Sequence, residues 1–80
     1  MSGSDDFGVT ENTRPEEAVR LAMGREARAQ EFYLRCAEIA SDRGVKKMFE
    51  FLANEERKHL ELLQQEYDRF VAREGCAVAR

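Results

Sequence analysis

Apolar residues recur at steps of three and four along two segments of the chain, and this periodicity predicts two amphipathic helices. The second predicted helix runs from about Arg43 to about Glu74. Its apolar stripe consists of Val45, Met48, Phe49, Leu52, Leu60, Leu63, Tyr67 and Phe70. The first predicted helix runs from Thr13 to about Ala40. Its stripe consists of Val19, Ala22, Met23, Ala29, Tyr33, Cys36, Ala37 and Ala40, widened by Phe32 and Ile39. The pattern therefore predicts an all-α chain.

Local signals predict where each helix begins and ends. Thr13 can cap the first helix, Glu16 can complete a capping box, and Pro15 suits the first turn, where a missing N–H does no harm. The segment Ser41-Asp42-Arg43-Gly44 predicts the turn between the helices, with Ser41 or Asp42 as the cap of the second. Gly75 predicts the end of that helix.

These boundaries divide the chain into three parts. Residues 1–12 are polar apart from Met1, Phe7 and Val9, and predict a flexible N-terminal tail, with a docking segment as the alternative. Residues 13–75 are predicted to form an antiparallel helical hairpin. Residues 76–80 form a C-terminal tail.

Three side chains that can bind metal stand within the apolar stripes. Glu26 lies on the stripe of the first helix, and Glu56 lies on that of the second. His59 is three residues after Glu56, so the two side chains can reach one point in space. An ionised carboxylate on a core face is costly unless something compensates it. A Glu-x-x-His pair that faces a helical core is the unit from which di-iron and di-manganese bundles are built.

The hairpin geometry brings these three residues to one level. Glu26 lies fifteen residues before position 41, and Glu56 lies fifteen residues after it. Both therefore stand about 22 Å from the turn in an antiparallel pair. The alternative is that these are ordinary charges on solvated helix faces, because Glu-x-x-His pairs are common there.

The size of the chain predicts association. Eighty residues in two helices cannot bury two apolar stripes without a partner, a metal or both. Two copies related by a two-fold axis would form a four-helix bundle. The bundle would contribute Glu26, Glu56 and His59 from each chain, which is the ligand set of the di-metal carboxylate bundles. Carboxylate and imidazole ligands without thiolate suit iron or manganese.

Composition excludes several other classes of function. The net charge is −3 and no basic cluster occurs, which argues against nucleic-acid binding. No apolar run approaches the roughly 18 residues of a membrane span, and no signal peptide is recognisable, so we expect a cytoplasmic protein or one held in a protein compartment. Cys36 and Cys76 form no C-x-x-C pair, so neither a structural zinc site nor a rubredoxin-type site is expected.

Two segments resemble the rubrerythrin-like proteins of the ferritin-like superfamily. Residues 26–33 are similar to that family's E-x6-Y segment, and residues 45–59 are similar to its second-helix signature, with Phe, Leu-Ala and E-x-x-H in the same order. The resemblance implies Glu26, Glu56 and His59 as iron ligands, two irons per dimer, and Tyr33 as a hydrogen-bond partner of the ligands. Family members usually carry four helices in one chain, so the second half-site is expected from another subunit. The two-helix form also resembles encapsulated ferritin-like proteins.

These observations leave three functional hypotheses. The first is a di-iron oxidoreductase of the ferroxidase or peroxidase type, which would use an external electron donor for peroxide reduction. The second is an iron-handling protein carried as cargo within a larger protein shell. The third is a metal-free helical dimerisation module, in which the buried Glu and His side chains satisfy one another. In each case the expected assembly is a homodimer or a higher oligomer of dimers.

Overall fold

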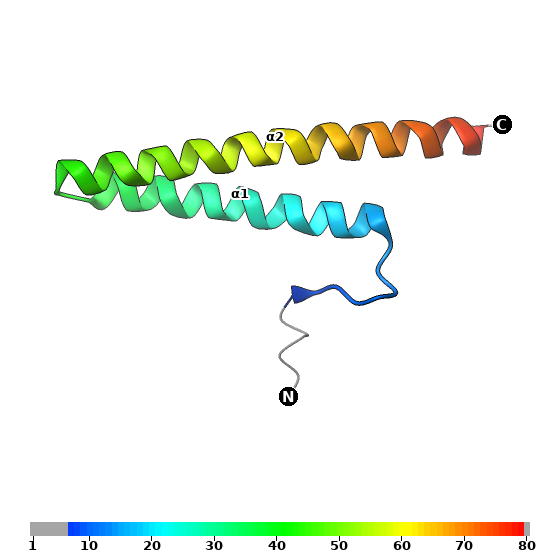
Figure 1. Cartoon of the computed structure of the whole chain (residues 1–80), viewed down its shortest axis with the longest axis horizontal. Coiled ribbons are helices and arrows are strands. Elements are labelled where there is room, and N and C mark those ends of the chain that lie inside the picture. The colour runs from blue at the N-terminus through cyan, green and yellow to red at the C-terminus, as the bar shows by residue number, and fades with distance from the viewer. Residues whose placement is uncertain (1–6, 80) are drawn as a thin grey trace.

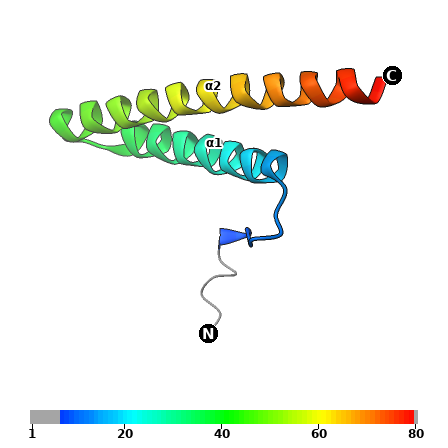
Figure 2. The same ribbon diagram turned by 45° about the vertical axis from the view of Figure 1, so that its right-hand side comes forward.

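The computed structural model describes residues 7–79, and describes side chains for residues 7–73. Within this part of the chain it contains two helices, α1 (Pro15–Ile39) and α2 (Arg43–Ala79). They run antiparallel and side by side, joined by a short turn, and α2 extends past the start of α1 (Figures 1 and 2). The predicted all-α hairpin is confirmed.

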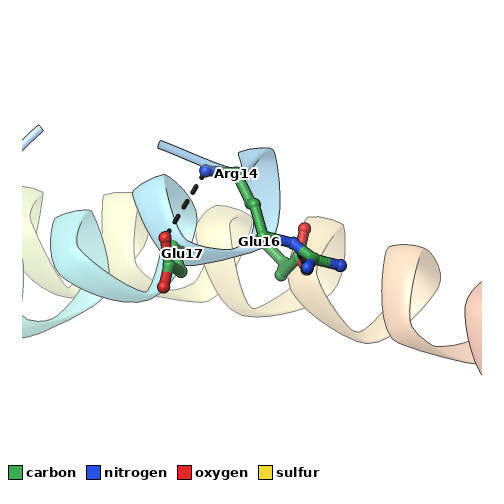
Figure 3. Close-up of polar contacts among 3 residues, drawn as sticks. All are labelled: Arg14, Glu16 and Glu17. Atoms are coloured by element: carbon green, nitrogen blue, oxygen red, sulfur yellow. Dashed lines mark hydrogen bonds and ion pairs between the residues drawn. The ribbon is translucent and has the colours of Figure 1, made fainter. Parts of the chain in front are cut away.

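The first helix begins at Pro15, and Arg14 rather than Thr13 is the capping position. Proline at the first helical position fixes this boundary, because the residue before a proline is held in extended backbone. Glu17, not Glu16, reaches back to the start of the helix, where its Oε1 accepts a hydrogen bond from the Arg14 N–H at 3.4 Å (Figure 3). Glu16 instead pairs with the Arg14 guanidinium at 2.9 Å.

The turn between the helices is closed by two side chains. The Asp42 carboxylate accepts a hydrogen bond from the Val45 N–H at 2.9 Å, which identifies Asp42 as the cap of α2. The Lys46 ammonium donates to the carbonyl of Ala37 at 2.5 Å and so satisfies a carbonyl in the last turn of α1. These two hydrogen bonds hold the end of α1 and the start of α2 in a fixed position relative to each other.

The C-terminal end of α2 differs from the prediction. The helix does not stop before Gly75 but continues to Ala79. A glycine within a helix costs only about 1 kcal/mol relative to alanine, and the alanine-rich residues around it favour the helix. The predicted tail at residues 76–80 is therefore helical as far as Ala79, and Arg80 lies outside the described residues.

The N-terminal segment lies on the side of α1 away from α2 (Figures 1 and 2). Arg25 donates a hydrogen bond from Nη2 to the carbonyl of Phe7 at 3.0 Å, and its guanidinium lies 6.0 Å from the centre of the Phe7 ring. The backbone at Gly8 has φ +75°, a left-handed conformation that suits glycine and lets the chain pass close to Leu21. The expected flexible tail includes residues 1–6, which lie outside the described part of the chain.

The helices meet along a line of small side chains. Among residues 7–73, the buried side chains are Ala37, which is 4% exposed, and Ala53, which is 2% exposed. The ring of Tyr33 stacks on that of Phe49 at a centroid distance of 6.1 Å and fills the space beside them. Val45 and Met48, which the pattern placed on the core stripe, are exposed. The apolar arc of α2 is wider than the surface that one neighbouring helix can cover.

Candidate metal centre

The middle of each helix contributes to one cluster of side chains. Glu26 projects from α1, and Glu56 and His59 project from α2 one turn apart. The tight turn at Asp42 keeps the two helices antiparallel and places residues equally distant from the turn at the same level. The hairpin therefore brings together the three residues that the sequence singled out.

The distances within this cluster are short. His59 Nδ1 lies 3.6 Å from Glu26 Oε1 and 3.8 Å from Glu56 Oε1. One ligand atom from each of the three residues can be chosen so that all lie within 4.8 Å of one another. Bonds of about 2.0–2.2 Å from a metal ion to carboxylate oxygen and imidazole nitrogen join donor atoms up to about 4.4 Å apart, so the cluster would contract by a few tenths of an ångström to hold one ion.

Burial differs among the three side chains. Glu56 is 20% exposed and Glu26 is 28% exposed, whereas His59 is 53% exposed. The cluster is thus covered on the side of the hairpin interior and open on one face. We call this face, onto which His59 opens, the open face.

One oxygen in the cluster has no hydrogen-bond partner. Glu26 Oε1 is buried, and no donor lies within hydrogen-bond distance of it in the described structure. Its neighbour His59 Nδ1, at 3.6 Å, is just beyond that distance. A buried acceptor without a partner costs about 1–3 kcal/mol, so proteins rarely retain one without a ligand or ion to satisfy it. The cluster therefore fits a cation.

The structure shows the Tyr33 ring in contact with two other aromatic rings. Its ring packs between Phe32, at a centroid distance of 5.6 Å, and Phe49. It lies two turns from Glu26 along α1. Within residues 7–73 no hydrogen bond joins its hydroxyl to the three ligands. Its contact with the ligands stays a prediction, and its packing role is what the structure shows.

Sequence reasoning did not find two features of the site. The contact line through Ala53 was missed, because alanine adds little to a hydrophobic pattern and the larger residues dominate the stripe. The orphaned oxygen of Glu26 was also missed, because hydrogen-bond satisfaction depends on side-chain rotamers that a sequence does not specify.

The geometry defines the class of this protein: a helical hairpin with a carboxylate–histidine cluster at mid-height, whose donor set suits a hard or borderline divalent cation. A search of protein families gives the particular family. The Rubrerythrin family model matches residues 6–67, most of the chain, so this protein belongs to the rubrerythrin family. No curated protein and no solved structure matched the chain. No helix among the described residues is long and apolar enough to cross a membrane.

Proposed function

We propose that this protein is a di-iron oxidoreductase whose metal centre forms between two copies of the chain. Glu26, Glu56 and His59 of each copy would hold the metals, with iron as the first candidate and manganese as the second. The orphaned buried oxygen of Glu26, beside two further ligand groups, is the observation that carries this proposal. Membership of the rubrerythrin family supports it independently.

The incomplete packing of the hairpin supports the two-copy arrangement. Among residues 7–73 the buried side chains are two alanines, so this part of the hairpin gains little from hydrophobic burial, at roughly 25 cal/mol per Å². Large apolar side chains remain exposed on the same molecule. Three ligand groups from each of two chains complete the six-residue set of the four-helix di-metal proteins. Dimerisation would therefore both cover exposed apolar side chains and complete the set of metal-binding residues.

The roles of the protein side chains follow from their positions. Iron in this ligand set supplies redox chemistry toward dioxygen or peroxide. Glu26 and Glu56, mostly covered, would provide negative charge that holds the cations close together. His59 would contribute a neutral nitrogen ligand from the exposed edge. Packing of a second copy on the open face would exclude bulk water from these groups.

Reconstitution under anaerobic conditions tests this proposal. Fe(II) should bind with a stoichiometry of two per dimer, and addition of dioxygen or hydrogen peroxide should oxidise it. Comparing oxygen-dependent oxidation with reductant-dependent peroxide turnover separates a ferroxidase from a peroxidase. A protein that binds no Fe(II) or Mn(II), and stays dimeric, would instead be a metal-free dimerisation module.

A further inference from the structure

Residues 7–13 fold back along the outer side of α1, and we call them the strap. Phe7 reaches Arg25, and Gly8 passes beside Leu21, so the strap runs antiparallel to the helix. At 100° per residue, Arg25 and Leu21 stand about 100° and 140° around α1 from Glu26, which faces α2. The strap therefore lies on a side of α1 that α2 leaves uncovered (Figures 1 and 2).

The base of the strap is a turn that holds its shape without help from α1. The Thr13 N–H donates to the carbonyl of Thr10 at 3.0 Å, and the Thr10 N–H donates to the Thr13 hydroxyl at 2.8 Å. The Asn12 N–H donates to the Thr10 hydroxyl at 3.1 Å. Threonine hydroxyls stabilise such turns by bonding nearby backbone groups. Because these bonds are internal to the strap, the turn keeps its form whether or not the strap lies on the helix.

The far end of the strap is held by Arg25. Its Nη2 donates to the carbonyl of Phe7 at 3.0 Å, and its guanidinium lies 6.0 Å from the centre of the Phe7 ring. A hydrogen bond from a charged donor and a cation over an aromatic face are both attractive. Phe7 nevertheless remains 63% exposed. The contact therefore attracts the end of the strap without burying it.

The middle of the strap is loosely packed on the helix. A cavity of about 270 Å³ lies between the strap and α1, and its walls are Gly8, Glu17, Arg20 and Leu21. Segments with few buried contacts open at a lower free energy than the whole fold. The contact at Phe7 is thus the main attraction that keeps the strap closed.

We propose that the strap opens and closes on the folded hairpin as a unit, turning about Thr10–Thr13 and held shut by the contact between Phe7 and Arg25. Opening uncovers Leu21 and the cavity beside it, so the strap controls access to the outer side of α1. This inference goes beyond the proposed function and does not depend on it. In the described structure no hydrogen bond or ion pair joins the strap to Glu26, Glu56 or His59.

Backbone order parameters from NMR relaxation of the full chain test the proposal. In the wild type the amides of residues 8–13 should have order parameters of about 0.8, close to those of a rigid backbone. Phe7→Ala removes the ring and should lower them below about 0.6, the range of flexible segments. The amides of residues 18–30 in α1 should keep their values. Val9→Ala is the matched control, because it shortens an apolar side chain of the strap and leaves Phe7 in place.

Three results would overturn the proposal. Wild-type values already in the flexible range would mean that the strap does not close. Unchanged values in Phe7→Ala would mean that Phe7 does not hold it. A fall in α1 together with the strap would mean that the strap is part of the hairpin's cooperative fold and does not open separately. Fe(II) content measured on Phe7→Ala should equal that of the wild type, so the proposed function is tested apart from the strap.

The partner of Phe7 is tested by a conservative exchange. Arg25→Lys keeps the positive charge but loses the planar group that bonds the carbonyl and lies over the ring, so it should free the strap as Phe7→Ala does. Combining the two changes should add little, because both break the same contact. Arg28→Lys makes the same exchange at an exposed arginine further along α1 and should leave the strap ordered. Full order of the strap in Arg25→Lys would contradict the assignment of Arg25.

Discussion

Polar side chains on the two faces of the hairpin differ in whether their hydrogen bonds are satisfied within the chain. On the polar side of α2, Arg57 donates to Glu61 at 2.8 Å and to Asn54 at 2.6 Å, and Gln64 donates to Asp68 at 2.9 Å. On the open face, Glu26 holds a buried oxygen without a hydrogen bond, and His59 is half-exposed beside it. One face is satisfied within the chain. The other has a carboxylate–histidine cluster in which one buried oxygen has no hydrogen-bond partner.

The two faces differ in what their polar groups contribute to the stability of the free chain. Exposed charge pairs on a helix contribute only about 0.3–0.5 kcal/mol each, but they keep that face in water. Carboxylates in an apolar surrounding destabilise a free hairpin, so we expect a bound cation to compensate the carboxylates of the cluster. The comparison therefore predicts large effects for changes on the open face and small effects on the polar side.

The largest effect is expected from neutralising the two carboxylates. Glu26→Gln with Glu56→Gln should abolish binding of Fe(II) and Mn(II) and remove any stabilisation by metal. That stabilisation is about 2.7 kcal/mol for the wild type at a metal concentration one hundred times Kd. Metal analysis and thermal melts with and without metal measure both quantities.

A control double variant also removes two negative charges, but at glutamates outside the cluster. Glu31→Gln with Glu50→Gln alters one exposed glutamate on each helix outside the cluster. It should bind metal as the wild type does. Equal metal content in the two double variants would show that Glu26 and Glu56 are not ligands.

Loss of the histidine should have the next largest effect. His59→Ala removes one nitrogen ligand from each half-site and should weaken metal binding by roughly tenfold or more, since removal of outer-shell partners alone costs 10–100-fold. Because His59 is half-exposed, helicity should change little. Competition with a chelator measures the affinity, and Gln65→Ala provides an exposed control on α2. An unchanged affinity would assign His59 a packing role.

Enlarging one of the two buried alanines, Ala53, should have a moderate effect on stability. Ala53→Leu inserts a large side chain at a buried position of α2 and should destabilise the protein by about 1–3 kcal/mol. Ala72→Leu, on an exposed position of the same helix, should change stability by less than about 0.5 kcal/mol. Chemical denaturation at a fixed protein concentration compares the two, and similar losses would place the helix contact elsewhere.

The smallest effect is expected on the polar side. Glu61→Gln breaks the exposed pair with Arg57 and should cost no more than about 0.5 kcal/mol, with metal content unchanged. The loss should disappear at high salt, since screening weakens exposed pairs. A larger loss that persists in salt would mean that this side also carries an interface.

The sequence predicted the hairpin because helical periodicity, a turn segment and capping residues agree along the chain. It also predicted the three clustered residues, because charged side chains inside an apolar stripe at matched distances from a turn leave few alternatives. The sequence prediction misplaced the N-cap of α1 at Thr13 and the end of α2 at Gly75. Several residues near each boundary have the chemistry to cap or end a helix. The prediction did not locate the contact line at Ala53, because the apolar stripe of α2 is wider than the surface that α1 covers.

Metal content measured together with native mass tests the central claim most directly. Protein purified without oxygen, reconstituted with Fe(II) and freed of excess metal should show a mass equal to a whole number of dimers, with two irons for each dimer. Removing the metal should lower the thermal stability of the same dimer. A folded monomer, or a dimer that retains no iron and gains no stability from Fe(II) or Mn(II), would contradict the account.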